Sequence, residues 1–205
     1  LLEEKQLLLR ETHHRIKNNM HVIQSLLSLE AHSLIDPTSQ RVLQGAAGKI
    51  RSMMVLYDRL YRSETHGEAT LRDFLPPLVE QIVDIFSAAG KVDTQLELDD
   101  ISLRDDQLSA IGILVNELIS NSMKYAFAET EAPRITISAR KDGDVIVLTY
   151  GDNGSGIPES VTIGDATDET AGFGMQLIGA LADQLNAIVR VERDSGTRIV
   201  LEFAA

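Results

Sequence analysis

The sequence contains no cysteine and no tryptophan, and its negative charges outnumber its positive ones. Without cysteine there is no disulfide framework and no thiolate metal or redox chemistry, which fits a reducing cytoplasm. No stretch approaches the roughly 18 apolar residues that a membrane span needs, so a membrane domain is not predicted. The formal net charge of -12 argues against nucleic acid as the main partner, because phosphate backbones favour clustered Lys and Arg.

The composition is that of an ordinary globular chain, with 205 residues, 43% hydrophobic and 24% charged. Residues 1–63 contain nine Lys and Arg against six Asp and Glu, whereas residues 64–205 contain ten against twenty-five. This uneven distribution of charge predicts two structural units that differ in their surface charge. The chain starts at Leu1, inside a helix-like pattern and without Met or a signal peptide, so we expect a fragment whose upstream portion is missing.

The first 63 residues predict a helical hairpin. Buried-type positions recur with spacings of three and four along a first coiled-coil-like seam, in which position 30 is Glu: Leu9, His13, Ile16, Met20, Ile23, Leu27 and Leu34. Asp36-Pro37 is expected to end this helix. A second seam follows at Ala46, Ile50, Met53, Tyr57 and Leu60. Because one hairpin leaves an apolar stripe uncovered, pairing with a second copy into a four-helix bundle is the simplest remedy.

Residues 71–205, after a polar linker at 64–70, predict a mixed α/β domain. Helices are expected at 71–86, 105–127 and 173–185, and strands at 92–98, 134–140, 144–150, 188–192 and 198–203. Residues 151–172 are rich in Gly, Ser, Thr, Asp and Glu without a period, which predicts a turn followed by a mobile loop.

Two adjacent histidines lie in the first helix. A single histidine in a helix is more often an ordinary surface or core residue than a reactive group. The seam register separates the pair, because His13 falls on the buried seam and His14 is turned by about 100° toward solvent. Glu11 and Asn18 share the face of His14, so polar partners are expected around its imidazole. The pattern favours His14 as a nucleophile and His13 as a packing residue.

Glu117 and Asn121 stand four residues apart on a mostly apolar helix, with Lys124 three residues further on. A charged face on a surface helix is the simpler interpretation. However, the neighbouring Leu and Ile residues predict burial, and buried polar groups are costly without a ligand. The amide oxygen of Asn121 suits Mg²⁺, which prefers oxygen ligands and accompanies phosphates.

Three glycine-containing segments are candidates for turns or phosphate contacts. Residues 152–156, Asp-Asn-Gly-Ser-Gly, follow a predicted strand and suit either a tight turn or a binding loop. Residues 172–174, Gly-Phe-Gly, open a predicted helix, where backbone N–H groups can face phosphate. Residues 45–49, Gly-Ala-Ala-Gly-Lys, lack the spacing of a phosphate loop and lie within the second seam, so they are not predicted to form one.

Taken together, these segments resemble a bacterial sensor histidine kinase core of the HWE-related class. The phosphoacceptor box HRxKN is His14 to Asn18, the N box is Glu117 to Tyr125, and the glycine boxes are Asp152 to Gly156 and Gly172 to Gly174. The resemblance covers nearly the whole chain. It implies a dimerising phosphotransfer hairpin (1–63) and an α/β sandwich ATP-binding domain (71–205) with a mixed sheet, as in gyrase, the heat-shock chaperones and MutL.

The resemblance also implies site roles. His14 is the phosphorylated residue, and Glu117 orients or deprotonates it. Asn121 holds Mg²⁺, Lys124 reaches the phosphates, Asp152 accepts from the adenine amino group, and Thr197 supports that aspartate. The implied nucleotide-binding set is Asn121, Lys124, Tyr125, Asp152, Gly154, Gly156, Gly172, Phe173, Gly174 and Thr197.

The implied reaction moves the γ-phosphoryl of Mg-ATP to His14 and then to an aspartate of a response regulator receiver domain. The expected cofactors are ATP and Mg²⁺, and the expected assembly is a homodimer, with a monomer as the alternative. This fragment is expected in the cytoplasm, whereas the full-length protein could be membrane-anchored. The alternative function is a histidine phosphotransfer protein or scaffold with the same fold that does not use ATP.

Overall fold

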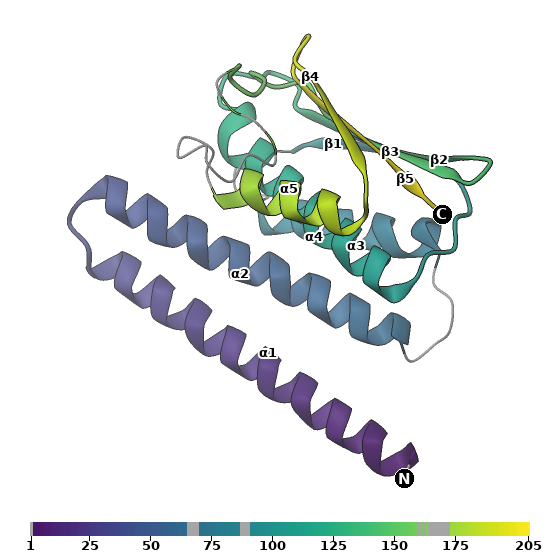
Figure 1. Cartoon of the computed structure of the whole chain (residues 1–205). Coiled ribbons are helices and arrows are strands. Elements are labelled where there is room, and N and C mark those ends of the chain that lie inside the picture. Colours follow the sequence, from purple (N-terminus) through teal and green to yellow (C-terminus); the bar gives the residue numbers. More distant parts are fainter. Residues whose placement is uncertain (1, 65–69, 87–90, 160, 162, 164–172) are drawn as a thin grey trace.

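The computed structural model describes residues 2–64, 70–86, 91–159, 161, 163 and 173–205 (Figure 1). At 2–10, 41, 59–64 and 173 it describes the backbone only. Helices α1 (Leu2–Ser33) and α2 (Pro37–Glu64) form the predicted antiparallel hairpin. Asp36 caps α2, because its side chain accepts from the Ser39 backbone N–H at 2.8 Å.

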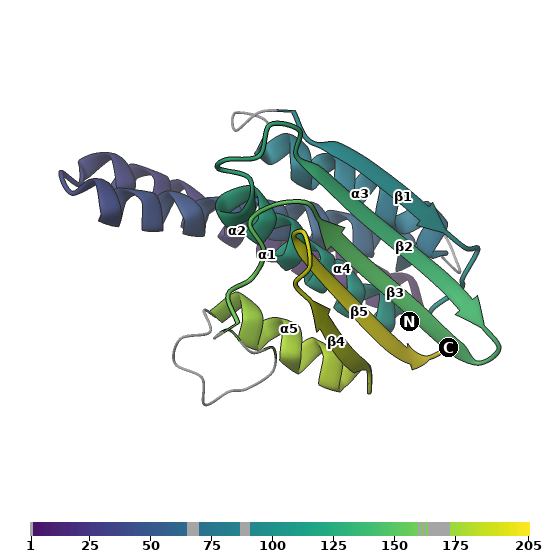
Figure 2. The same ribbon diagram turned by 90° about the horizontal axis from the view of Figure 1, so that it is seen from above.

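The second half of the chain contains a five-stranded mixed sheet. Its strands are β1 (Asp93–Leu98), β2 (Arg134–Asp142), β3 (Val145–Asp152), β4 (Ile188–Glu192) and β5 (Thr197–Ala204). Their order is β1-β2-β3-β5-β4, as Figure 2 shows from above. β1 and β2 are parallel and the other pairs are antiparallel. The expected fold class, a helical hairpin followed by an α/β sandwich, is confirmed.

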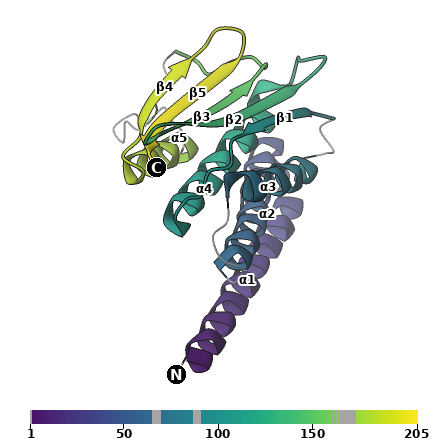
Figure 3. The same cartoon turned by 90° about the vertical axis from the view of Figure 1, so that its right-hand side faces the viewer.

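The helices α3 (Leu71–Ile85), α4 (Asp105–Asn121) and α5 (Phe173–Gln184) cover one face of the sheet (Figure 3). Residues of β3 alternate between exposed or half-buried and buried, and Ile146, Leu148 and Tyr150 pack into the core beneath these helices. Asp152 continues the same alternation at the end of the strand. The hairpin forms a third layer, in which α2 contacts α3 and α4 and α1 lies on the far side of α2 (Figures 1 and 3).

Several predicted boundaries differ from the structure by one or two residues, and two of the differences affect the site. The helix expected over 105–127 is α-helical only to Asn121 and continues as a π-helix, η2 (Ser122–Ala126). The wider π turn changes the direction of the side chains that follow, a feature that often marks functional sites. The strand expected to end at Tyr150 extends to Asp152, because Gly151 and Asp152 still pair with β5. Much of the loop predicted over 151–172 lies outside the described residues.

Polar groups are buried where α4 faces the hairpin. Gly112 packs against Leu56 of α2 and Phe74 of α3 so closely that a side chain would not fit. Glu117 bonds to Lys49 of α2, and Asn116 and Ser120 lie on the helical arc between these two contacts. Asn116 and Ser120 are fully buried, and their side-chain polar atoms have no hydrogen-bond partner within the described part of the chain.

Large apolar side chains are exposed toward the closed end of the hairpin. This apolar stripe consists of Val22, Ile23, Leu26, Leu29, Ile35 and Val42. Ile23 belongs to the predicted seam, yet it is 48% exposed, so α2 alone does not cover the seam along its whole length. Among the helices that the structure describes, none is both long and apolar enough to cross a membrane.

Candidate functional site

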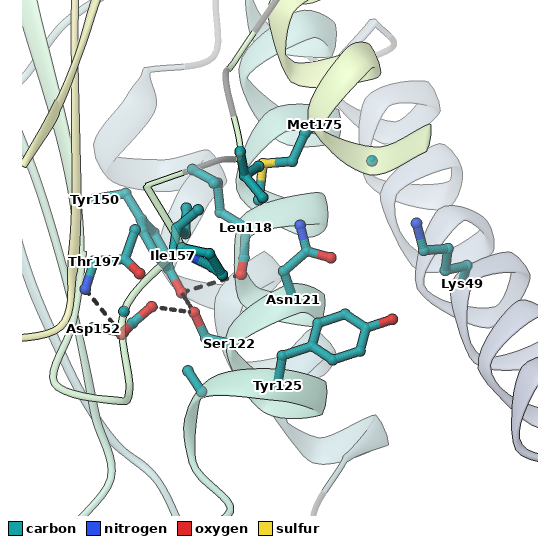
Figure 4. A pocket seen from close by; sticks show the side chains of 15 residues that line it. Lys49, Leu118, Asn121, Ser122, Tyr125, Tyr150, Asp152, Ile157, Met175 and Thr197 are labelled. Atoms are coloured by element: carbon teal, nitrogen blue, oxygen red, sulfur yellow. Dashed lines mark hydrogen bonds between the residues drawn. The ribbon is translucent and has the colours of Figure 1, made fainter. Parts of the chain in front are cut away.

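A cavity of about 520 Å³ lies between α4, η2, the end of β3, the start of α5 and one residue of α2 (Figure 4). Its walls include Leu118, Ile157 and Met175, with a few polar side chains between them. A mostly apolar cavity with few polar groups suits a small ligand with a flat apolar part. The segments that line it include parts of the N box and of both glycine boxes.

Asp152 is the polar anchor at one end of the cavity. Its Oδ1 accepts from the backbone N–H groups of Gly154 at 3.0 Å and Thr197 at 3.2 Å, and its Oδ2 accepts from Ser122 Oγ at 2.5 Å. The register of β3 and β5 produces the second contact, because it places Thr197 opposite Asp152. A carboxylate has about four acceptor positions, so with three donors bound it can take one more from a ligand.

Ser122 and Tyr150 hold this carboxylate from the helix side. The single hydroxyl proton of Ser122 goes to Asp152, so the Tyr150 hydroxyl shares its own proton between Ser122 Oγ at 2.8 Å and the Leu118 carbonyl oxygen at 3.3 Å. Complete burial, reinforced by the charge of Asp152, raises the pKa of Tyr150 far above its usual value. Tyr150 therefore remains a donor, and the orientation of Asp152 is fixed before any ligand binds.

At the opposite end of the cavity, the lining residue Lys49 forms an ion pair that joins the two halves of the chain. Lys49 Nζ of α2 lies 2.7 Å from Glu117 Oε2 of α4, with side-chain exposures of 28% and 1%. Gly174, in the first turn of α5, approaches the same carboxylate, because a Cβ there would lie 2.8 Å from Glu117 Oε2. The structure thus brings Glu117 of the N box and Gly174 of the second glycine box together, and α2 adds Lys49.

Lys124 is placed differently from its expected position at the phosphates. Its Nζ donates to the Gly45 carbonyl oxygen of α2 at 3.2 Å, and Lys124 is not among the residues that line the cavity. Burial, together with the nearby positive charge of Lys49, lowers the pKa of Lys124. In this arrangement Lys124 joins the hairpin to the α/β half, and its role toward phosphate stays a prediction.

Asn121 lines the cavity beside Glu117 and Gly174, and its amide makes no hydrogen bond to another described residue. Its carbonyl oxygen is therefore available to a ligand. Over the described ranges, no group of three or more His, Cys, Asp or Glu could hold a metal by itself. The single amide oxygen of Asn121 nevertheless fits Mg²⁺, which commonly takes one or two protein ligands and completes its shell with phosphate and water oxygens.

The glycine boxes shape the rim of the cavity. Gly156 has φ +79°, a conformation that side-chain-bearing residues rarely adopt, and it lets the chain turn over the cavity. The Ser155 backbone N–H donates to the Ala126 carbonyl of η2 at 2.9 Å, which fixes this loop against the π-helix. Tyr125 is 72% exposed at the rim. Gly172 lies outside the described residues, and only the backbone of Phe173 is described.

The two histidines occupy the positions that the seam register predicts. His14 is exposed, whereas His13 is partly buried and its Nδ1 hydrogen bonds to the Tyr57 hydroxyl of α2. Glu11 is engaged by Arg15 at 2.7 Å, so its carboxylate pairs with a cation of the same helix. Helix α1 lies across α2 from α4 (Figure 1), and the described contacts bring Glu117 to Lys49 and not to His14.

Three residues of the site were not identified from the sequence. Ser122 and Tyr150 give little local signal, although Tyr150 shares the inward alternation of Asp152. Lys49 closes the Gly-Ala-Ala-Gly-Lys segment that was not predicted to form a phosphate loop, and that prediction is correct because the segment is helical. Its lysine nevertheless reaches the cavity.

Comparison with known families matches both halves of the chain. Residues 11–86 match the family described as histidine kinase, and residues 106–205 match the histidine kinase-, DNA gyrase B- and HSP90-like ATPases. The sensor histidine kinase PdtaS of Mycolicibacterium smegmatis is 26% identical over 88% of this chain and 35% of its own length. The blue-light-activated histidine kinase 2 of Erythrobacter litoralis is 25% identical over 94% of this chain and 55% of its length.

Solved structures agree on the fold. The histidine kinase domain of the Erythrobacter litoralis EL346 blue-light activated histidine kinase superposes with a TM-score of 0.60 at 18% identity, covering 89% of this chain and 95% of that one. Acinetobacter baumannii histidine kinase AdeS gives 0.54 at 14% identity, covering 93% and 97%. The chain spans between about a third and just over half of the length of the two relatives described above.

Nothing in these matches supports the alternative of a scaffold without a nucleotide site, because the ATPase family matches the half of the chain that contains the cavity. The order of the four boxes, the two family matches and the fold lead to one assignment. The chain belongs to the histidine kinases, with an HWE-type histidine kinase hairpin followed by a domain of the histidine kinase-, DNA gyrase B- and HSP90-like ATPases.

Proposed function

We propose that this chain transfers the γ-phosphoryl group of ATP to His14 and then to an aspartate of a response regulator receiver domain. The observation that carries the proposal is one cavity with an oriented carboxylate at one end and Asn121 and Lys49 at the other, where Glu117 pairs with Lys49 behind the cavity wall. Asp152, with its remaining acceptor position, receives the adenine amino group, and Tyr125 covers the rim. Since the reaction consumes ATP, we place it in the cytoplasm.

At the phosphate end, Asn121 would hold the Mg²⁺ that neutralises charge on the phosphates during transfer. A neutral imidazole nitrogen of His14 attacks the γ-phosphorus, the N–P bond forms, and the bond from γ-phosphorus to the ADP oxygen breaks. The second imidazole nitrogen then gives up its proton, which Glu117 accepts. Exposure of His14 supports its role as the nucleophile, because the attacking group must reach a ligand outside its own helix.

The described arrangement separates α1 from the cavity by α2, so transfer needs either movement of the α/β half or His14 from a second copy. The apolar stripe supports pairing of two hairpins into a four-helix bundle. The hairpin is the less acidic half of the chain, which favours docking of the acidic pocket of a receiver domain.

The test is incubation of the chain with γ-labelled ATP and Mg²⁺. We expect an acid-labile, base-stable phosphoprotein that is lost when the metal is chelated and that passes its label to a receiver domain. Absence of labelling in a folded sample would contradict the proposal. Mixing His14→Gln with Asp152→Asn chains, at an ATP concentration too low to occupy the weakened site of the Asp152→Asn chain, distinguishes the two routes, because the mixture then regains label only if one copy phosphorylates the other.

A further inference from the structure

Among the described residues that line the cavity, only Asp152 and Lys49 carry a charge. The two residues come from different layers of the molecule and lie at opposite ends of the cavity (Figure 4). Asp152 is committed to backbone donors, Ser122 and an adenine amino group. Lys49 is therefore the one described cation in the cavity wall that can neutralise the phosphates of a bound nucleotide.

The surroundings of Lys49 fit an anionic ligand. A Cβ on Gly174 would lie 3.4 Å from Lys49 Nζ, so the ammonium group stands beside the first turn of α5. The N-terminus of this 12-residue helix presents backbone N–H groups and a partial positive charge. Asn121 Nδ2 would lie 3.5 Å from the same Cβ, so the expected magnesium ligand is a neighbour.

The ammonium group also has donors to spare. Lys carries three N–H donors, and in the described part of the chain its only bond is to Glu117. It can keep that bond and donate to a phosphate oxygen, since its side chain is 28% exposed toward the cavity whereas Glu117 is 1% exposed. The ion pair thus holds the ammonium group in place and leaves N–H donors for a ligand.

We propose that Lys49 is a phosphate-binding residue that the phosphoacceptor hairpin contributes to the ATP site, an inference that rests on the proposed function. Because α2 supplies this contact, ATP binds to both halves of the chain and stabilises their docked arrangement. Bound ADP carries one phosphoryl group fewer than ATP, so it stabilises the docked arrangement less than ATP does. The nucleotide state is in this way linked to the contact between the hairpin and α4.

The test compares Mg-ATP with adenosine, which lacks phosphates, by calorimetry on the whole chain. Lys49→Gln should weaken Mg-ATP binding by about 10-fold to 100-fold, the loss of one charge-assisted hydrogen bond, and leave adenosine binding unchanged. Lys49→Arg, which keeps the charge, should restore most of the Mg-ATP affinity. Arg51→Gln, which removes the same charge from an exposed position of α2, is the matched control and should bind both ligands like the parent chain.

Equal Mg-ATP affinity of the parent chain and Lys49→Gln would overturn the role of Lys49 while leaving the proposed function in place. A parent chain that binds neither ligand would instead overturn the proposed function. Lys49→Gln also leaves Glu117 buried without its cation, which can destabilise the docked arrangement. The double variant Lys49→Gln, Glu117→Gln removes both charges, and in this chain too Mg-ATP binding should fall while adenosine binding persists.

Discussion

The two halves of the chain bury their apolar residues to different degrees. In the α/β half, side chains of the sheet and of α3, α4 and α5 form one core, and the largest fully buried side chains all lie there. In the hairpin, by contrast, the side chains of the apolar stripe are exposed, and Leu56 is buried only where α2 meets α3 and α4. The α/β half can thus enclose a ligand, whereas the hairpin has exposed apolar side chains that can pack against another protein surface.

The largest expected effect tests whether the hairpin contributes the phosphate acceptor. His14→Gln should abolish labelling by γ-labelled ATP, because no other nucleophile of α1 combines its exposure with its position in the box. His13→Gln should keep the label while losing the bond to Tyr57. Phosphopeptide mapping of both variants checks this, and label retained in folded His14→Gln would refute the assignment.

A second variant tests whether Glu117 of the α/β half acts as a general base in the phosphorylation of His14. Glu117→Gln keeps the shape but removes the charge, so phosphorylation should slow by about 10²-fold to 10⁴-fold, the usual worth of a general base. Mg-ATP affinity should persist, because Lys49 remains free to bind phosphate. Single-turnover rates at saturating Mg-ATP measure the effect.

A melting curve and a matched control separate catalysis from stability at Glu117. Glu80→Gln changes the same charge at an exposed position of α3 and should leave the rate unchanged. If Glu117→Gln lowered only the melting temperature and kept the rate per folded molecule, its role would be structural.

A third variant tests whether Asp152 binds the adenine of ATP in the cavity of the α/β half. Asp152→Asn should weaken ATP binding by about 10-fold to 100-fold, because an amide at this position loses the charge that the adenine amino group and the Ser122 hydroxyl donate to. Asp144→Asn, an exposed change at the β2–β3 turn, is the control. Unchanged affinity in a titration of Asp152→Asn would place the adenine elsewhere.

The smallest effect on stability, and the clearest on assembly, is expected at the apolar stripe. Leu26→Glu should change the free energy of unfolding by no more than about 0.5 kcal/mol, since the side chain is already exposed, but should separate the proposed dimer into monomers. Val145→Glu, at an exposed apolar position of β3, should leave the assembly unchanged. Sedimentation at several concentrations decides, and a monomeric parent chain would contradict the pairing of hairpins.

Much of the fold follows from local periodicity. The 3.6-residue period placed His13 against α2 and left His14 exposed, and alternation along β3 carried Asp152 into the cavity. Lys49 could not be identified in this way, because its contact with Glu117 joins residues 68 positions apart. The π-helix was also missed, since the sequence of Ser122–Ala126 continues the helical pattern and its contacts with Asp152 and Ser155 join residues far apart in the chain.

Asn116 and Ser120 give the interface between α4 and the hairpin an unusual energy balance. Each buried polar group without a partner costs about 1–3 kcal/mol relative to its hydrated state. Separating α2 from α4 would return these groups to water, and this gain would offset part of the cost of exposing the apolar surface around Leu56. Separating the two layers therefore costs less free energy than the buried apolar surface alone would require.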